Sequence, residues 1–548
     1  QDPGYTIAFE KMDDAYLHSK AARQPGPIGS LSNIYLFCCI GLIILLIACV
    51  NFMNLSTARS LERAKEVGVR KVLGVSPWAL RRQFLSESIL VSMIAAVLAV
   101  GLTRLSLPVV SILSGKEFIP GTLLSGQLII WMAALTLVTG LLAGIYPAWF
   151  LSRFQPMVVL KGAFQPSRGS LSLRKALVVF QFTLSIALIA GTAVVYAQLK
   201  FLNRHDLGFT KDQMLVINFE GDAGVQQRIE QIKRSLADQP GVLSVAASRA
   251  VPGEFLPNAG TDIQGPDGQM KNKIPLIYEI DFDFLPCLKI PLVAGRNFSR
   301  AFLTDSTQAL VINEAAAKLY GYRHPADAIG KKYDQWGQQG RIIGVVKDFN
   351  FRSLHSQVEP LTLRYGMPST LNRIVVAIKA DHVASTITAL EKTWKTAAPQ
   401  RPFSYHFLDQ SFNEQYESDQ HFGYLFSLFS ALAIFIACLG LFGLATFTAQ
   451  QRIKEIGIRK VLGASVYHIV VLISKDFVRL VLVAIVIAVP LCLLVMNQWL
   501  KDFAYRITIS PSIFLYTGAV ALLIALLTIS WQTLKAALAN PVQSIKNE

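Results

Sequence analysis

The chain has 548 residues, of which 52% are hydrophobic and 16% are charged, so it is too apolar for an ordinary soluble protein and long enough for several domains. Its formal net charge of +16 would suit a nucleic-acid-binding surface, but most of the basic residues lie in short loops between apolar runs. These features indicate an integral membrane protein and argue against nucleic acid as a partner.

Seven apolar runs are each long enough to cross about 30 Å of hydrocarbon. One of the seven runs, Ser88 to Leu113, is interrupted by a charged residue, Arg104. Arg104 lies near the Pro108 end of the run, where its side chain can reach the lipid headgroups and act as an anchor. No acidic residue lies in mid-span, which disfavours an ion-coupled carrier. The other six runs are Ile34 to Thr57, Phe118 to Ser152, Ala176 to Leu199, Phe422 to Gln451, Leu480 to Leu500 and Ile507 to Leu534.

The basic loops set the expected topology. Lys and Arg number seven between Arg59 and Arg82, five between Arg153 and Lys175, and six between Arg452 and Arg479. By the positive-inside rule these loops are cytoplasmic, which places residues 1–33 and 200–421 on the other side of the membrane. An amino terminus on that side requires an earlier helix or signal. We therefore expect eight spans in the full protein, seven of them visible in an N-terminally incomplete chain.

Residues 200–421 form the one sizeable soluble segment and mix strand-like with helical patterns. An α+β fold is therefore expected. From Leu408 through Phe447 no proline interrupts the chain, which predicts one continuous helix that enters the membrane and forms a stalk with Tyr196–His205. The predicted strands are 214–219, 243–247, 309–312, 341–346 and 374–378, and the predicted helices are 226–237, 314–320 and 383–396.

Motifs for catalysis are missing. The segment most similar to a phosphate-binding loop is Gly330–Lys332. However, Pro325 stands where the first glycine is required, and Lys332 stands where the motif requires Ser or Thr. Asp348 and His355 are interpreted as solvated loop residues and not as an acid and a base. Cys287 is the one cysteine of six outside the apolar runs, and no Cys/His metal spacing occurs. We expect no catalytic residue, no bound metal and no directly bound cofactor.

The most informative pattern is a 15-residue segment that occurs twice. Residues 62–76 read ERAKEVGVRKVLGVS and residues 451–465 read QRIKEIGIRKVLGAS, with ten of fifteen positions identical. Both copies follow an apolar run directly, and the topology puts both in the cytoplasm. A basic membrane anchor would explain the Lys and Arg residues but not the recurring acid and glycines. The repeat therefore favours specific protein docking.

The first copy predicts a short helix followed by a turn. Residues 63–72 are amphipathic, with Val67 and Val69 expected against the bilayer or the helix bundle and the charged residues facing the cytosol. Gly74 is expected to end the helix in a left-handed conformation. Ser76 is a candidate N-cap for the next helix, with Pro77 at its first position.

The twin Arg-x-Lys-Glu-[Val/Ile]-Gly-[Val/Ile]-Arg-Lys-Val-Leu-Gly-x-Ser segments resemble those of FtsX-like permease domains in the MacB and LolC/LolE group of ABC systems. The resemblance covers nearly the whole chain and implies a multi-pass α-helical membrane protein with a large α+β extracytoplasmic domain. It implies the end of a first periplasmic domain with its stalk (1–33), a first permease domain of three transmembrane helices (34–165), a helix opening the second half (172–200), a MacB-like periplasmic core domain (201–421) and a second three-helix permease domain (422–548).

The function implied by the resemblance is that of a permease subunit in the bacterial inner membrane. It would transmit motion from a separate cytoplasmic ABC ATPase dimer, which binds ATP and Mg²⁺, to periplasmic domains that export or extract amphiphilic substrates such as lipoproteins, peptides or drugs. MacB carries one permease unit fused to its ATPase, whereas this chain has two units and no phosphate-binding loop of its own, so the chain itself is not expected to be an enzyme.

Other partners and functions stay open. Membrane lipids are expected partners, and a periplasmic adaptor or an outer-membrane protein is an open addition. One alternative is an FtsX-type regulator of a periplasmic cell-wall hydrolase, and another is a peptide-sensing signalling permease. The implied ATPase-coupling residues are Arg63, Lys65, Glu66, Gly68, Arg70, Lys71 and Gly74 in the first motif, and Arg452, Lys454, Glu455, Gly457, Arg459, Lys460 and Gly463 in the second.

Overall fold

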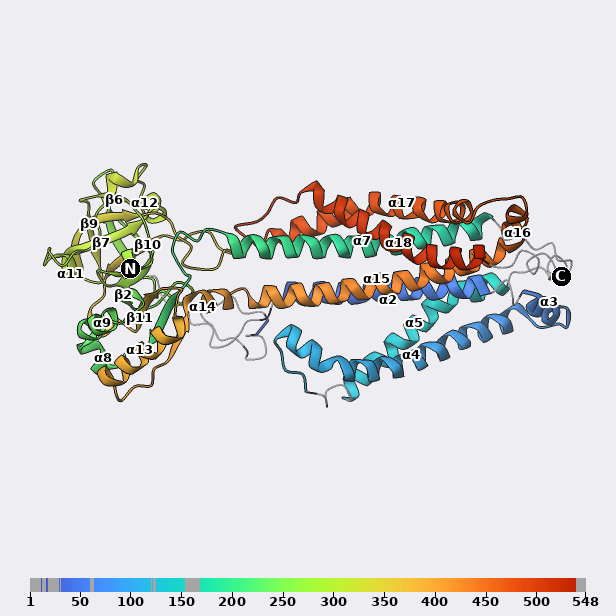
Figure 1. Cartoon of the computed structure of the whole chain (residues 1–548), viewed down its shortest axis with the longest axis horizontal. Helices are drawn as coiled ribbons and strands as arrows, with labels where there is room; N and C mark the ends of the chain where they lie inside the picture. The colour runs from blue at the N-terminus through green and yellow to red at the C-terminus, as the bar shows by residue number, and fades with distance from the viewer. Residues whose placement is uncertain are drawn as a thin grey trace. The chain divides into compact units, whose positions relative to one another are not determined.

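The computed structural model describes residues 11, 16–17, 29, 31–59, 64–119, 121, 125–152 and 168–538. The chain divides into two compact units (Figure 1). The first comprises residues 1–197, 419–499 and 508–548, and the second comprises residues 198–418 and 500–507. The residues expected to end a first external domain, 1–33, lie largely outside the described residues.

Seven described helices are long and apolar enough to cross a membrane, as the apolar runs predict. Some begin well before their apolar run, because their first turns are polar. Others begin later: the uncharged run from Phe118 becomes helical only at Gly126. The seven are α2 (Leu31–Arg59), α4 (Pro77–Ser114), α5 (Gly126–Ser152), α7 (Arg168–Arg204), α15 (Glu417–Gln451), α17 (Val466–Leu500) and α18 (Pro511–Leu538), and two short helices, α3 (Ala64–Val72) and α16 (Ile453–Val461), precede α4 and α17.

Helices α2 and α15 lie side by side and meet at equivalent positions of the sequence repeat. The repeat offset is 389 residues (62 to 451), so Asn51 corresponds to Gly440. The Asn51 side-chain amide donates to the Ile436 carbonyl, and a Cβ on Gly440 would lie 1.5 Å from Asn51 Oδ1. The Asn51 side chain therefore lies against the backbone of α15, where glycine leaves space for it.

Helix α7 is the central helix of the second repeat. Val178, Phe182 and Ile186 belong to one buried core with residues of α15, α17 and α18. Of the seven apolar helices, α7 is the most buried: 61% of its most apolar 18-residue stretch is buried. Its branched and aromatic side chains thus join the three helices that follow the external segment.

The second unit is an α+β domain, as predicted. Its described strands form one mixed sheet in the order β12-β1-β11-β2-β5-β10-β7-β9-β8-β3-β4, with β6 paired to β9. The β5–β10 and β7–β9 pairs are parallel and the other pairs antiparallel. The strands are β1 (Met214–Asn218), β2 (Val242–Ser248), β3 (Thr261–Gln264), β4 (Met270–Lys273), β5 (Leu276–Ile280), β6 (Leu292–Gly295), β7 (Ala309–Asn313), β8 (Lys332–Gln335), β9 (Gln338–Val346), β10 (Leu361–Tyr365), β11 (Arg373–Ile378) and β12 (Tyr405–Phe407).

Two cores lie on this sheet. Strands β1, β2 and β11 pack against α9 and α13, with Trp394 fully buried among them. Strands β3, β7, β8 and β9 pack against α12 around Tyr320. The helices of this unit are α8 (Ala223–Gln227), α9 (Ile229–Ala237), α10 (Phe284–Cys287), α11 (Asp305–Gln308), α12 (Glu314–Leu319), α13 (Val383–Ala397) and α14 (Leu408–Glu414), with short 3₁₀ turns at Pro325–Ala328 and Pro368–Thr370.

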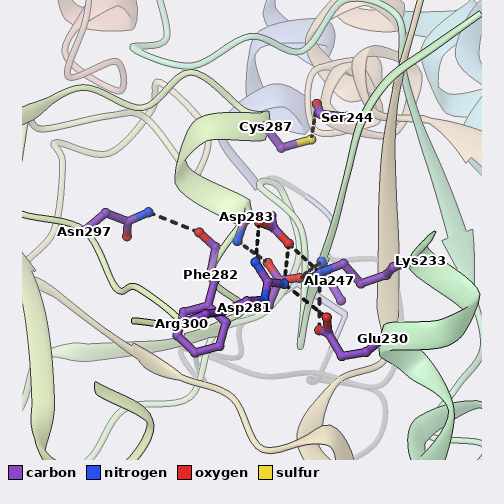
Figure 2. A network of polar contacts seen from close by, with 10 residues as sticks. All are labelled: Glu230, Lys233, Ser244, Ala247, Asp281, Phe282, Asp283, Cys287, Asn297 and Arg300. Atoms are coloured by element: carbon purple, nitrogen blue, oxygen red, sulfur yellow. Dashed lines mark hydrogen bonds and ion pairs between the residues drawn. The ribbon is translucent and has the colours of Figure 1, made fainter. Parts of the chain in front are cut away.

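A buried ion cluster links α9 to the loop after β5 (Figure 2). Lys233 and Asp281 side chains are 5% and 1% exposed and bond to each other, and Lys233 Nζ also lies 2.8 Å from Asp283. Arg300 holds Asp283 from the other side, at 2.8 Å. Burial raises the pKa of Asp281 to about 6, whereas the hydrogen bond from Arg300 lowers the pKa of Asp283 to about 2.

The prediction of one continuous helix from Leu408 through Phe447 is wrong. Helix α14 ends at Glu414, a turn covers Gln415 and Tyr416, and α15 begins at Glu417. The Tyr416 amide donates to the Asn413 carbonyl, and the Tyr416 hydroxyl accepts from the Leu354 amide. Tyr416 is only 3% exposed, so its packing in the soluble domain outweighs helical continuity. The predicted helix 226–237 is likewise divided, at Arg228, into α8 and α9.

Candidate functional site

Both copies of the repeated motif form the same elbow of a short helix, a glycine turn and a long helix. At the end of α3, Gly74 donates to the Lys71 carbonyl and Val75 to the Arg70 carbonyl, at 3.1 and 3.0 Å. At the end of α16 the corresponding bonds, from Gly463 and Ala464, measure 3.1 and 2.9 Å. This is the Schellman pattern, and the two glycines have φ of +92° and +89°, as predicted for Gly74. We call these segments, 64–78 and 453–467, the first and second elbows.

A serine starts the long helix in each elbow. Ser76 has an extended backbone, and its hydroxyl accepts from the Ala79 amide at 3.2 Å, with Pro77 at the first helical position as predicted. Ser465 accepts from the His468 amide at 3.3 Å. The caps fix where each long helix begins, and the left-handed glycines fix the direction of the turn before it.

The recurring acid of each motif pairs with the recurring arginine one helical turn later. Glu66 lies 2.7 Å from Arg70, and Glu455 lies 2.8 Å from Arg459. These pairs are about half exposed, so each stabilises its helix by only about 0.3–0.5 kcal/mol. They hold the charged groups in the same arrangement on both elbows.

Each elbow also carries a ridge of exposed apolar side chains. The ridge of the first elbow consists of Val69, Val72, Leu73 and Trp78, which are 48%, 64%, 78% and 66% exposed. Their counterparts on the second elbow, Ile458, Val461, Leu462 and Tyr467, are 54%, 67%, 80% and 73% exposed. Large apolar side chains grouped beside charges are typical of a surface that binds another protein or the membrane.

The opposite side of each short helix is buried. Val67 and its counterpart Ile456 are 2% and 5% exposed, and Gly68 and Gly457 are buried too. Val67 therefore packs in the helix bundle, whereas Val69, two residues further along the helix, faces another direction and belongs to the exposed ridge. Contact of Val69 with the bilayer stays a prediction.

Two basic residues of the first repeat bond to the end of α5. Lys71 Nζ donates to the Ser152 carbonyl at 2.6 Å, and Arg81 Nε donates to the Ser152 hydroxyl at 2.9 Å. Burial, together with the charge of Arg81, lowers the pKa of Lys71. Directly before the second elbow, Arg452 lies 3.4 Å from Asp476. Arg63 lies outside the described residues, as do the side chains of Lys65 and Lys454.

Replacing Gly74 or Gly463 by alanine is expected to open the elbow. An added Cβ would meet no atom within 4 Å at either position, so the cost is that of the left-handed backbone, about 1–2 kcal/mol. Hydrogen exchange of α3 or α16 amides should accelerate about tenfold. Gly101→Ala, in the interior of α4 with equally open space, is the control and should leave these amides unchanged. Equal exchange in all variants would argue against a required turn.

A feature that sequence patterns did not indicate lies in the second unit, where the loop between α17 and α18, Leu500–Ile507, packs on the soluble domain. Gln198 is fully buried, donates to the Tyr505 carbonyl at 2.9 Å and accepts from the Ile507 amide at 2.9 Å. The His355 ring stacks on Phe503 at 4.3 Å. His355 therefore holds this loop and is not the solvated residue that the sequence suggested.

Gln198→Leu is expected to release the 500–507 loop. Two partly buried backbone groups would lose their partner, at a cost of about 1–3 kcal/mol in all, so the Tyr505 and Ile507 amides should exchange with solvent about tenfold faster. Gln231→Leu, at an exposed position on α9, is the control. If both variants leave exchange in the loop unchanged, Gln198 does not hold it.

Among the described residues, no group of three or more His, Cys, Asp or Glu side chains is arranged to hold a metal ion. Asp348 is half-buried and accepts from the Ala315 amide at the start of α12, so it serves that helix and is not the solvated residue expected. The elbows are thus the strongest candidate site.

These features define a class of protein. It is a membrane protein with a tandem repeat of helices, two matching elbows and an α+β domain. Residues 38–156 and residues 427–541 each match the model of the FtsX-like permease C-terminal family. The chain therefore contains two FtsX-like permease segments, one in each half of the repeat.

The relatives are ABC permeases. The macrolide export ATP-binding/permease protein MacB of Syntrophobacter fumaroxidans is 29% identical over 122 residues, which cover 22% of this chain and 16% of that protein. The uncharacterized ABC transporter permease YknZ of Bacillus subtilis is 27% identical over 134 residues, which cover 24% of this chain and 30% of that protein. The matched part spans less than a third of these two relatives.

Among solved structures, the periplasmic region of MacB from Actinobacillus actinomycetemcomitans is similar to part of this chain. The alignment covers 37% of this chain and 92% of that structure, with 16% sequence identity and a TM-score of 0.27.

Proposed function

We propose that this permease transmits motion from a separate cytoplasmic ABC ATPase dimer to its α+β domain on the outer face of a bacterial inner membrane. The ATPase binds ATP and Mg²⁺ and hydrolyses the ATP. Each of the two elbows binds one ATPase subunit. The moving domain then expels or extracts an amphiphilic substrate, such as a lipoprotein, a peptide or a drug.

The duplicated elbow is the observation that carries this proposal. Two copies on one chain repeat the same helix, turn, cap and Glu–Arg pair, and both expose an apolar ridge beside these charges. A repeated surface suits a partner that presents the same surface twice, as a dimeric ATPase does. ATP can shift the permease only if the ATPase binds one arrangement of the two elbows better than the other.

The connections between the two units provide a mechanical path. The chain passes from one unit to the other after residues 197, 418, 499 and 507. Two of these passages lie in α7 and α15, which continue into the membrane unit as helices, and the other two flank the 500–507 loop. Movement of the membrane helices can thus reach the soluble domain through covalent links and through the bonds of Gln198.

Co-expression with candidate ATPases tests the proposal. The Glu66→Lys, Glu455→Lys double variant replaces an attractive pair on each elbow by like charges and should lose the copurifying ATPase. If the ATPase copurifies with the double variant as it does with the wild type, the elbows do not bind the ATPase. An ATPase-dead partner should then leave an amphiphilic substrate retained in the membrane. An unhydrolysed cell wall with normal substrate release would instead favour regulation over transport.

A further inference from the structure

A buried cation, Arg174, lies near the start of α7 in the membrane unit. The residue is 6% exposed, and among the described residues of this unit it is the one charged residue that is buried. In the described part of the chain no acidic side chain pairs with it, and its Nε has no hydrogen-bond partner. A buried charge without a counter-charge costs stability, which makes Arg174 a candidate for a role other than stabilising the fold.

Arg174 contacts both of the helices that lead into the elbows. Its Nη2 donates to the Thr57 carbonyl of α2 at 3.2 Å, and its guanidinium carbon lies 5.7 Å from the centre of the Phe447 ring of α15. Thr57 is in the last turn of α2, where carbonyls have no partner within the helix and a cation is favourable. A guanidinium over an aromatic ring is attracted to it. One side chain therefore holds α2 and α15 together.

The two contacts lie at matching places of the sequence repeat. With the 389-residue offset, Thr57 corresponds to Thr446, the residue directly before Phe447. The elbows begin at Ala64 and Ile453, about two turns of helix beyond these contacts. Asn51 also joins α2 to α15, but it lies farther from the elbow along α2. Arg174 thus links the two helices closer to the elbows than Asn51 does.

We propose that Arg174 is a positioning residue that couples the two elbows, so that movement of one is passed to the other. A shift of α2 relative to α15 would separate the guanidinium from the Thr57 carbonyl or from the Phe447 ring. Either separation leaves a buried charge with fewer partners, which opposes independent movement of the two helices. The inference rests on the proposed function and deepens it, because an ATPase dimer can drive both elbows as one only if they are linked.

Hydrogen exchange of the whole permease in lipid nanodiscs tests this inference. Gly74→Ala strains the turn of the first elbow, and with Arg174 present it should accelerate exchange of the α16 amides in the second elbow at least about fivefold. In the Arg174→Met background, Gly74→Ala should accelerate exchange of the α3 amides only. Methionine is unbranched like the arginine stem but carries neither the charge nor the donors.

Gln181→Met is the matched control. Gln181 is also a buried polar residue of α7, and it donates to the Ala437 carbonyl of α15 at 3.1 Å but bonds to no described residue of α2. This variant should leave the response of α16 to Gly74→Ala unchanged. A response of α16 that is equal with arginine and methionine at position 174, or absent with both, would overturn the inference. A lower melting temperature of Arg174→Met, with faster exchange throughout α2, α7 and α15, would assign the residue to stability and overturn it as well.

Failure of this inference differs from failure of the proposed function, because the exchange measurement contains no ATPase. If the elbows bind the ATPase but are not coupled, the ATPase would copurify with the wild type and the α16 amides would not respond to Gly74→Ala. If the elbows are coupled but do not bind the ATPase, the α16 amides would respond, and this response would still be lost in Arg174→Met.

Discussion

Replacing Leu73 and Leu462 together by aspartate is expected to weaken ATPase binding at least about 100-fold. These side chains are 78% and 80% exposed and stand at the same point of the two ridges. Burying a leucine contributes about 1.5–3 kcal/mol, and each 1.4 kcal/mol is tenfold in affinity, so each elbow should account for about tenfold or more. The measurement is a binding titration of the purified permease in lipid nanodiscs with its ATPase.

The fold should survive this double substitution, because both side chains already face solvent. Leu303→Asp is the matched control, since Leu303 is 90% exposed on the soluble domain, away from both elbows in sequence. Each single variant should retain part of the affinity if each elbow holds one ATPase subunit. Wild-type affinity in the double variant would contradict the ridges as a docking surface.

Lys233→Met is expected to destabilise the soluble domain by about 3–5 kcal/mol near pH 8. The substitution removes the ammonium group from Asp281, whose side chain is 1% exposed, and leaves a buried carboxylate without its counter-charge. Burial alone would lower the pKa of Lys233, but the charge and hydrogen bond of Asp281 outweigh it and raise that pKa, so the ion pair is present at neutral pH. Pulse proteolysis in urea measures the loss.

The loss should be smaller at pH 5 than at pH 8. The pKa of Asp281 is about 6 in the folded domain, above its ordinary value of about 3.9, so the folded state binds a proton more readily and stability falls as pH rises through this window. Without the lysine that pKa rises further, and protonation relieves the buried charge. Asp283 acts in the opposite sense, but its stabilising contribution is lost only as pH falls from about 4 toward 2.

Two further variants check the cause of this effect. In the Lys233→Met background, Asp281→Asn should recover part of the lost stability, because no unpaired charge remains in the core. Lys392→Met, at an exposed position on α13, should change stability by less than about 0.5 kcal/mol. A loss that is equal at pH 5 and pH 8 would mean that packing, and not the buried charge, accounts for it.

Local signals in the sequence predicted most of the membrane unit. Span length follows from uninterrupted apolar runs, and the positions of Gly74, Ser76 and Pro77 follow from backbone preferences that act within a few residues. Five strands of the soluble domain, β1, β2, β7, β9 and β11, were located to within a few residues for the same reason, whereas others, such as β5 and β10, were not predicted. The fold class was therefore predictable before any packing was known.

Long-range contacts were not predictable from these signals. The break at Gln415 and Tyr416 depends on a hydroxyl that accepts from Leu354, and the 500–507 loop depends on Gln198, which is 307 residues from Tyr505. The exposed ridges were also missed. The sequence marked the charged residues of each elbow, but the direction of Val69 and Leu73 depends on which face of the short helix the rest of the unit covers.

The contact between α2 and α15 shows a consequence of joining two copies in one polypeptide: equivalent positions can carry different residues. In a dimer of identical chains a residue near the symmetry axis meets itself, so asparagine would face asparagine and glycine would face glycine. Here Asn51 meets its own counterpart as Gly440, and the bulk on one side fits the space on the other. A symmetric dimer cannot place a large residue opposite a small one at its axis, because both positions carry the same residue. Tandem duplication thus freed the two halves to become complementary to each other and no longer copies.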